Sequence, residues 1–117
     1  MPLSKDQILS ASTKLRTKKI SVPEWGKDAE VFIRELTGDE RDRYDQLIYE
    51  HKSDFRGLRA WMVALSLCDE QGNSMGFTEA EIKQLGGKSG AVVDRIFEAA
   101  KRLSGLEESA VEEAEKN

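Results

Sequence analysis

The first regular alternation of apolar and polar residues lies near the N-terminus, in residues 18–24. Ile20 and Val22 fall on one face with polar residues between them, which is the period-two pattern of a β-strand. Pro23 has no backbone N–H, so it places the end of this strand at a sheet edge or at a bend. The segment therefore predicts a strand whose end lies at a sheet edge or at a bend.

Residues 29–36 alternate in the same way, so they predict a second strand, joined to the first by a turn over residues 25–28. Thr37 is suited to cap a following helix, and Glu40 stands three residues later, where it completes a capping box. Apolar side chains at three- and four-residue spacing give that helix one apolar stripe: Tyr44, Leu47, Ile48 and His51.

A further helix is predicted to begin at Ser53 or Asp54, with the stripe Phe55, Leu58, Trp61, Met62 and Leu65. Nearly every residue in 61–68 is apolar, so we expect this segment to be the buried centre of the domain. Residues 69–74 form a polar turn, in which Gly72 and Asn73 suit a positive φ.

Two more helices follow. Thr78 and Glu81 predict a capping box and a short helix that ends near residues 86–87. The last helix begins at about Ser89 and ends at Gly105, a natural C-terminal stop. Its inward positions are Val92, Val93, Ile96, Phe97, Ala100 and Leu103.

The pattern predicts an α+β protein, mostly α, in which an N-terminal β-hairpin packs on a bundle of about four helices. Residues 18–106 form the expected single domain. Residues 1–17 are an arm or short helix, with a capping box at Ser4 and Gln7. Residues 107–117 are an acidic tail that we expect to be mobile.

The chain has 117 residues, 34% of them charged, and a net charge of −4, which disfavours non-specific nucleic-acid binding. Its two ends carry opposite charge. The start holds Lys5, Lys14, Arg16, Lys18 and Lys19, and the end holds Glu107, Glu108, Glu112, Glu113 and Glu115. One interpretation is two solvated ends. The other is that the ends promote head-to-tail self-association or bind different partners.

Motifs for catalysis or for binding a metal or nucleotide fail on spacing. Residues 87–89 (GKS) resemble the end of a phosphate-binding loop, but Ile82 stands where the motif needs glycine. Residues 69–74 lack the glycine and glutamate of a calcium loop at the required positions. His51 is the only histidine and Cys68 lies in an apolar run, so we expect no enzyme, cofactor or metal site.

One cysteine and the absence of any apolar run near ~18 residues predict a cytoplasmic protein without a membrane span. The two tryptophans differ. Trp61 belongs to a helical stripe and is expected in the core. Trp25 lies in the turn, where it either covers the core or anchors a protein contact.

Four segments in order carry a family resemblance: residues 22–26 (VPEWG), 34–42 (RELTGDERD), 64–73 (ALSLCDEQGN), and Lys88-Ser89 leading to 94–97 (DRIF). Together they resemble the tail assembly chaperones of long-tailed, siphovirus-type bacteriophages. The resemblance covers approximately residues 20–106.

The resemblance implies a non-catalytic assembly factor in the host bacterial cytoplasm that is not part of the mature virion. It implies binding to the tape-measure protein, which the chaperone keeps soluble, and promotion of tail-tube assembly around that protein. A longer frameshifted form would contact tail-tube subunits. Coating a long target favours a homo-oligomer, through the unlike ends or an edge strand beside Pro23. Two alternatives are a structural head-tail or tail connector retained in the virion and a small nucleic-acid-binding regulator.

A chaperone for a helical target needs an adaptable apolar groove with a charged exterior. The exposed faces of the helices over residues 44–51 and 92–103 are candidates for its walls. The candidate partner-binding residues are Trp25, Tyr44, Ile48, Met62 and Met75. The alternative for each is that the side chain fills the core of the monomer.

Overall fold

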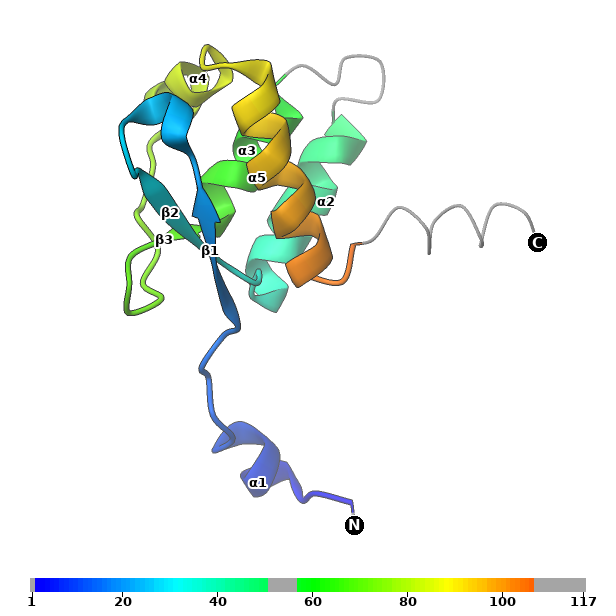
Figure 1. Cartoon of the computed structure of the whole chain (residues 1–117). Coiled ribbons are helices and arrows are strands. Elements are labelled where there is room, and N and C mark those ends of the chain that lie inside the picture. Colours follow the sequence, from blue (N-terminus) through cyan, green and yellow to red (C-terminus); the bar gives the residue numbers. More distant parts are fainter. Residues whose placement is uncertain (1, 51–56, 107–117) are drawn as a thin grey trace, which may run out of the picture.

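The computed structural model describes residues 2–50 and 57–106. Three antiparallel strands lie beside a layer of helices, and a short N-terminal helix stands away from both layers (Figure 1). The strand order is β1-β2-β3, with β1 at Thr17–Ser21, β2 at Glu30–Arg34 and β3 at Leu67–Cys68. The expected α+β architecture is confirmed, with a three-stranded sheet in place of a two-stranded hairpin.

The hairpin follows from the alternation of its residues. Ile20 pairs with Val31 across the strands, and both Ile20 and Ile33 are buried. Beyond β1 the fully buried Val22 donates its backbone N–H to Ala29 O at 2.9 Å, so pairing continues past the strand. Pro23 begins a turn of 3-10 helix, η1 (Pro23–Trp25), which confirms a bend there.

The helices begin and end where the sequence signals predict. α2 spans Gly38–Glu50, α4 spans Glu79–Gly86 and α5 spans Gly90–Leu103. All three predicted capping boxes form: Ser4 with Gln7, Thr37 with Glu40, and Thr78 with Glu81. Past α5, Gly105 has a φ of 76°, and the Leu106 N–H reaches back to Lys101 O at 2.7 Å, as a glycine stop requires.

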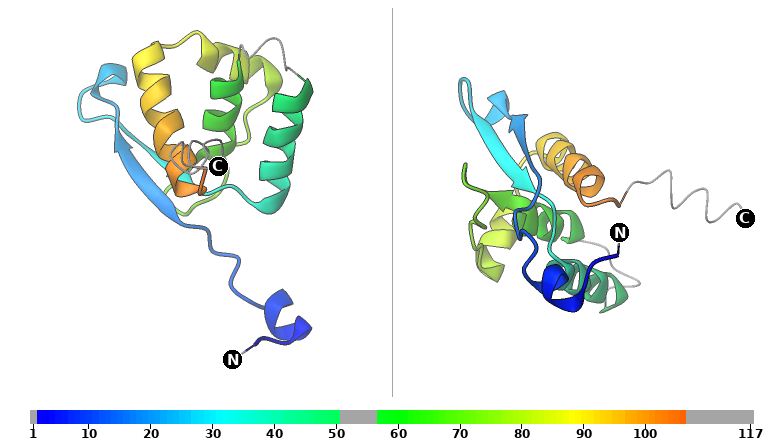
Figure 2. Two further views of the ribbon diagram at one scale, coloured as in Figure 1. Left: turned by 90° about the vertical axis from the view of Figure 1, so that its right-hand side faces the viewer. Right: turned by 90° about the horizontal axis from the view of Figure 1, so that it is seen from below.

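α3 (Leu58–Ser66) is the central helix, and α2, α4 and α5 all pack against it (Figure 2). Met62 and Val63 on α3 and Ile96 on α5 are buried in the core. The expected buried centre over residues 61–68 is therefore present, although Trp61 and Leu65 are only partly buried. The predicted helix start at Ser53 or Asp54, and with it Phe55 and His51, lies outside the described residues.

Two local expectations need correction. The apolar run continues past α3 as the strand β3, which pairs with Phe32 and Ile33 of β2. In the turn that follows, Gly72 has the expected positive φ of 86°, whereas Asn73 does not. The Asp69 carboxylate accepts from the Asn73 N–H at 3.0 Å, which holds the Asn73 backbone without a left-handed conformation.

Candidate functional site

Two clefts adjoin at one end of the helical layer and form the candidate site. One cleft, of about 750 Å³, lies between α2, α3 and α4, and the other, of about 640 Å³, lies between α3 and the start of α5. They share the lining residues Gly57, Ala60 and Gly86. We call the pair the α2–α5 groove, because it runs from the wall of α2 across α3 to the wall of α5.

The α2 half of the groove has an apolar floor and a charged rim. Its apolar lining comes from three helices, with Leu47 on α2, Trp61 on α3 and Ile82 on α4. The Arg43 guanidinium lies over the Trp61 ring, 5.3 Å from its centroid. Glu50, Glu79 and Lys83 complete the lining, so charged residues of both signs accompany the apolar side chains.

The α5 half is lined by small residues and one ion pair. Gly90, Ala91 and Val93 line it from α5, beside Lys88. Arg59 Nε lies 3.3 Å from Asp94 Oδ1, and the Arg59 guanidinium also covers the Phe97 ring at 5.5 Å. Side chains this small let the backbone of a bound segment approach the groove closely.

Small residues also shape the junction of the two halves. Gly57 precedes α3 with a φ of 83°, a left-handed conformation that side chains rarely adopt. A Cβ on Gly86 would meet the Ala60 Cβ at 3.8 Å, an ordinary van der Waals distance. No sequence signal predicts this junction, because glycines at helix ends are also common as plain stops.

The structure separates the five candidate partner-binding residues. Tyr44 and Met62 lie in the core, which was the alternative to partner binding for each of them. Trp25, Ile48 and Met75 are exposed, but on different elements: η1, α2 and the segment between β3 and α4. None of the five lines the α2–α5 groove, although Ile48 follows its lining residue Leu47 directly in α2.

Trp25 lies beside a second feature, the ion pair between η1 and α5. Arg95 Nη1 donates to Glu24 Oε1 at 2.9 Å and to Ser21 O at 3.2 Å, and Arg95 Nη2 contacts Glu24 Oε2. The Arg95 hydrogen bond is the main cause that lowers the pKa of Glu24 from 4.5 to about 2. This contact holds the tip of the hairpin against α5.

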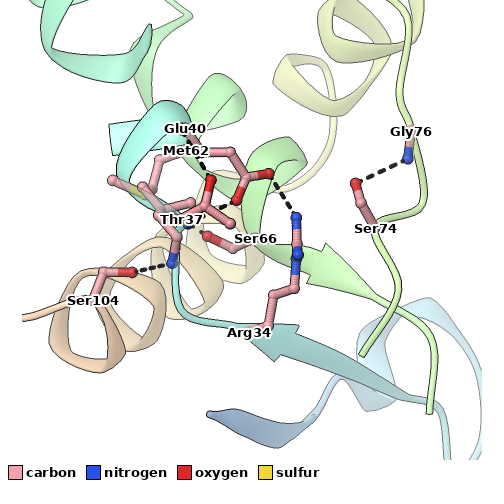
Figure 3. A network of polar contacts seen from close by, with 9 residues as sticks. Arg34, Thr37, Glu40, Met62, Ser66, Ser74, Gly76 and Ser104 are labelled. Carbon is pink, nitrogen blue, oxygen red and sulfur yellow. Dashed lines mark hydrogen bonds and ion pairs between the residues drawn. The ribbon is translucent and has the colours of Figure 1, made fainter. Parts of the chain in front are cut away.

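The opposite end of the hairpin is held by a network that joins β2, α2 and the end of α5 (Figure 3). Arg34 Nη2 lies 2.6 Å from Glu40 Oε2, while Glu40 Oε1 accepts from the Thr37 N–H at 2.9 Å. Ser104 Oγ accepts from the Leu36 N–H at 2.9 Å. These contacts fix the position of α2, and with it one wall of the groove.

Cys68 and Asp69 both have structural roles in the fold. Cys68 is fully buried, and this burial raises the pKa of its thiol. Asp69 accepts from the backbone N–H groups of Asn73 and Gln71, which lower the pKa of its carboxyl and hold the turn. Within residues 2–50 and 57–106, no three histidine, cysteine or acidic side chains gather as metal ligands. In the same ranges, no helix is both long and apolar enough to span a membrane.

Comparison with known proteins identifies the family of this chain. Among curated proteins no sequence matches the chain. Among solved structures, the tail assembly chaperone of bacteriophage HK97 is similar, with a TM-score of 0.61 and 26% sequence identity. The match covers 84% of this chain and 90% of the HK97 chain. The sequence pattern of the family described as phage tail assembly chaperone matches residues 4–117. The chain therefore belongs to the phage tail assembly chaperone family, as the four sequence segments predicted.

Proposed function

We propose that this tail assembly chaperone binds an amphipathic helix of the tape-measure protein in the α2–α5 groove. The observation that carries the proposal is the groove itself, which has an apolar floor at Trp61 and Ile82 and a charged rim. An amphipathic helix binds such a surface by placing its apolar stripe on the floor and its polar residues at the rim. Binding keeps the tape-measure protein soluble and promotes assembly of the tail tube around it.

The groove suits a varied target for a physical reason. Its α2 half offers aromatic and aliphatic contacts, and its α5 half offers small side chains that accept different shapes. Because the rim carries residues of both signs, such as Lys83 and Glu79, it does not exclude target helices with one particular charge pattern. A long helical protein with many similar apolar stripes thereby offers successive segments to the same surface.

Several copies of the chaperone on one target are part of the proposal. β1 pairs with β2 alone among the described strands, so its other edge is open to a strand from a second copy. The work takes place in the host cytoplasm without catalysis, and a longer frameshifted form brings in tail-tube subunits. Sedimentation of the purified chain across a concentration series checks the homo-oligomer, and a constant monomer mass contradicts it.

A matched pair of substitutions tests the groove. Ala91 and Ala80 are both exposed and both second residues of their helices, but only Ala91 lines the groove. Ala91→Trp fills the groove, whereas Ala80→Trp adds the same bulk outside it. Fragments of the tape-measure protein are co-expressed with each variant, and the soluble fraction of the fragment is measured.

We expect wild-type chain and Ala80→Trp to rescue fragment solubility and Ala91→Trp to lose the rescue. Equal rescue by both variants contradicts binding in the groove and leaves the chaperone activity intact. Failure of the wild-type chain with every fragment contradicts binding to the tape-measure protein itself. Circular dichroism of both variants confirms that the tryptophans leave the helices folded.

A further inference from the structure

The N-terminal helix α1 (Lys5–Leu9) is well formed at its start although it is only five residues long. Gln7 donates its backbone N–H to Ser4 Oγ at 3.2 Å, and the Ser4 N–H donates to Gln7 Oε1 at 2.8 Å. Leu3 and Ile8 occupy the two positions of a hydrophobic staple around this capping box. The sequence therefore favours a helix at this site.

The apolar side chains of α1 have no cover among the described residues. Leu3 is 61% exposed, Ile8 58% and Leu9 76%, and no residue of α1 is buried. Figures 1 and 2 show α1 at the end of an extended segment, away from the sheet and the other helices. A helix this short is unstable in water unless it packs against something. The apolar side of α1 is therefore expected to pack against another segment.

The two ends of the chain leave the domain side by side. Arg16, where the arm meets β1, donates from Nη2 to Leu103 O at 2.6 Å at the end of α5. Arg16 also donates its backbone N–H to Glu35 Oε1 at 2.9 Å, which fixes the root of the arm. Residues 107–117 therefore begin four positions after a residue that the arm contacts.

The chemistry of residues 107–117 complements that of the arm. The arm and β1 carry five cations against one acid, Asp6, in residues 5–19. Residues 107–117 carry five glutamates against one cation, Lys116. Three small apolar residues stand among the glutamates: Ala110, Val111 and Ala114. Opposite charge and matching apolar content on neighbouring segments favour binding between them.

We propose that residues 107–117 bind α1 of the same chain and cover Leu3, Ile8 and Leu9. The connector over residues 10–16 spans at most ~25 Å when fully extended, and it allows α1 to fold back toward the end of α5. In this pairing the glutamates of the segment complement the charge of Lys5 and Lys14, and its small apolar residues complement the exposed apolar side of α1.

Paramagnetic broadening tests the contact in the full chain. A nitroxide is attached at Ala110→Cys, where Cys68 does not compete because it is fully buried. We expect loss of amide signal intensity across α1 at low salt, and recovery of that intensity at 1 M NaCl, where the screening length is about 3 Å. A nitroxide at Lys27→Cys, in the hairpin turn, is the control and leaves α1 unaffected.

Two further samples decide the outcome. Mixing ¹⁵N-labelled chain with nitroxide-labelled ¹⁴N chain shows whether the contact lies within one chain. Broadening of α1 in that mixture assigns the acidic segment to a second copy and overturns the proposal, as does absence of broadening in the singly labelled chain. Replacing Glu107, Glu108, Glu112 and Glu113 with lysine abolishes the broadening. Broadening that survives this reversal also overturns the proposal. Unchanged amide shifts over residues 57–106 show that the domain stays folded.

Discussion

Two arginine–glutamate pairs fasten the hairpin to the helices, one at each end, and they differ chiefly in burial. Arg34 and Glu40 have side chains that are 12% and 18% exposed. Arg95 and Glu24 have side chains that are 40% and 42% exposed. The ion-pair distances alone would rank the two contacts together. Burial separates them, because water and salt screen the exposed pair and reach the largely buried pair much less.

The surroundings of the two pairs widen this difference. Glu40 also accepts the Thr37 N–H as part of a capping box, and Arg34 Nε is buried with no hydrogen-bond partner. Loss of the Glu40 side chain therefore leaves a largely buried cation and a Thr37 N–H without its acceptor, although Thr37 Oγ1 still caps the helix. Loss of Glu24 leaves Arg95 in contact with water and with Ser21 O. The largely buried Arg34–Glu40 pair is thus expected to control stability, and the exposed Arg95–Glu24 pair is expected to hold the hairpin tip in position.

The largest predicted effect is that of Glu40→Ala. Removing one partner of a shielded ion pair, together with a capping interaction, is expected to lower the free energy of unfolding by about 2–4 kcal/mol. Urea denaturation followed by circular dichroism measures the loss. A loss no larger than that of Glu24→Ala contradicts the role assigned to burial.

Glu40→Gln sharpens the same comparison. The amide oxygen still accepts the Thr37 N–H, so the cap survives while the charge opposite Arg34 disappears. We expect a loss smaller than that of Glu40→Ala, and the difference between the two variants measures the cap. Equal losses for both variants would assign the whole effect to the ion pair.

Glu24→Ala is predicted to cost clearly less stability than Glu40→Ala, and 1 M NaCl is predicted to remove most of that cost. The exposed pair is screened at this salt concentration, whereas the Arg34–Glu40 pair is shielded by protein. Urea denaturation of wild-type chain and both variants, each in 0.1 M and 1 M NaCl, makes the comparison. A Glu24→Ala cost that persists at high salt assigns it to packing of η1.

The smallest effect is a pH dependence that Glu24 carries. Its pKa lies at about 2 in the folded chain, below the ordinary 4.5, mainly because of the Arg95 hydrogen bond. The unfolded chain therefore binds this proton first as the pH falls, so the contribution is fully present above about pH 5 and disappears toward pH 2. The stability difference between wild-type chain and Glu24→Gln, measured at pH 6, 4 and 3, should shrink steadily. A constant difference contradicts the ion pair as its source.

Local signals in the sequence predicted the helix boundaries, because capping boxes at Thr37 and Thr78 and the glycine at 105 act within a few residues. β3 escaped prediction because a two-residue strand has no period to detect and its partners lie more than thirty residues earlier. The Glu24–Arg95 contact joins residues 71 positions apart, so no local sequence pattern predicts it.

The candidate site was predictable in kind and not in detail. An apolar groove involving α2 and α5 was expected, and the α2–α5 groove does have walls from both helices. Its junction at Gly57, Ala60 and Gly86 depends on how α3 and α4 pack. The hydrophobic periodicity of the sequence does not specify that packing. Met62 was proposed for adaptability and lies in the core, because one helical stripe serves equally for binding or for burial.

The contact of Arg16 with Leu103 O has a practical consequence for anyone handling the protein. The groove opens at the start of α5, whereas Arg16 at the root of the N-terminal arm contacts the C-terminal end of α5, about 20 Å away by helical rise over fourteen residues. Affinity tags, fluorophores or fused reporters at either terminus would be joined to the domain on the side opposite the groove opening. Immobilising the molecule by one of its ends on a sensor chip should therefore present the groove to solution.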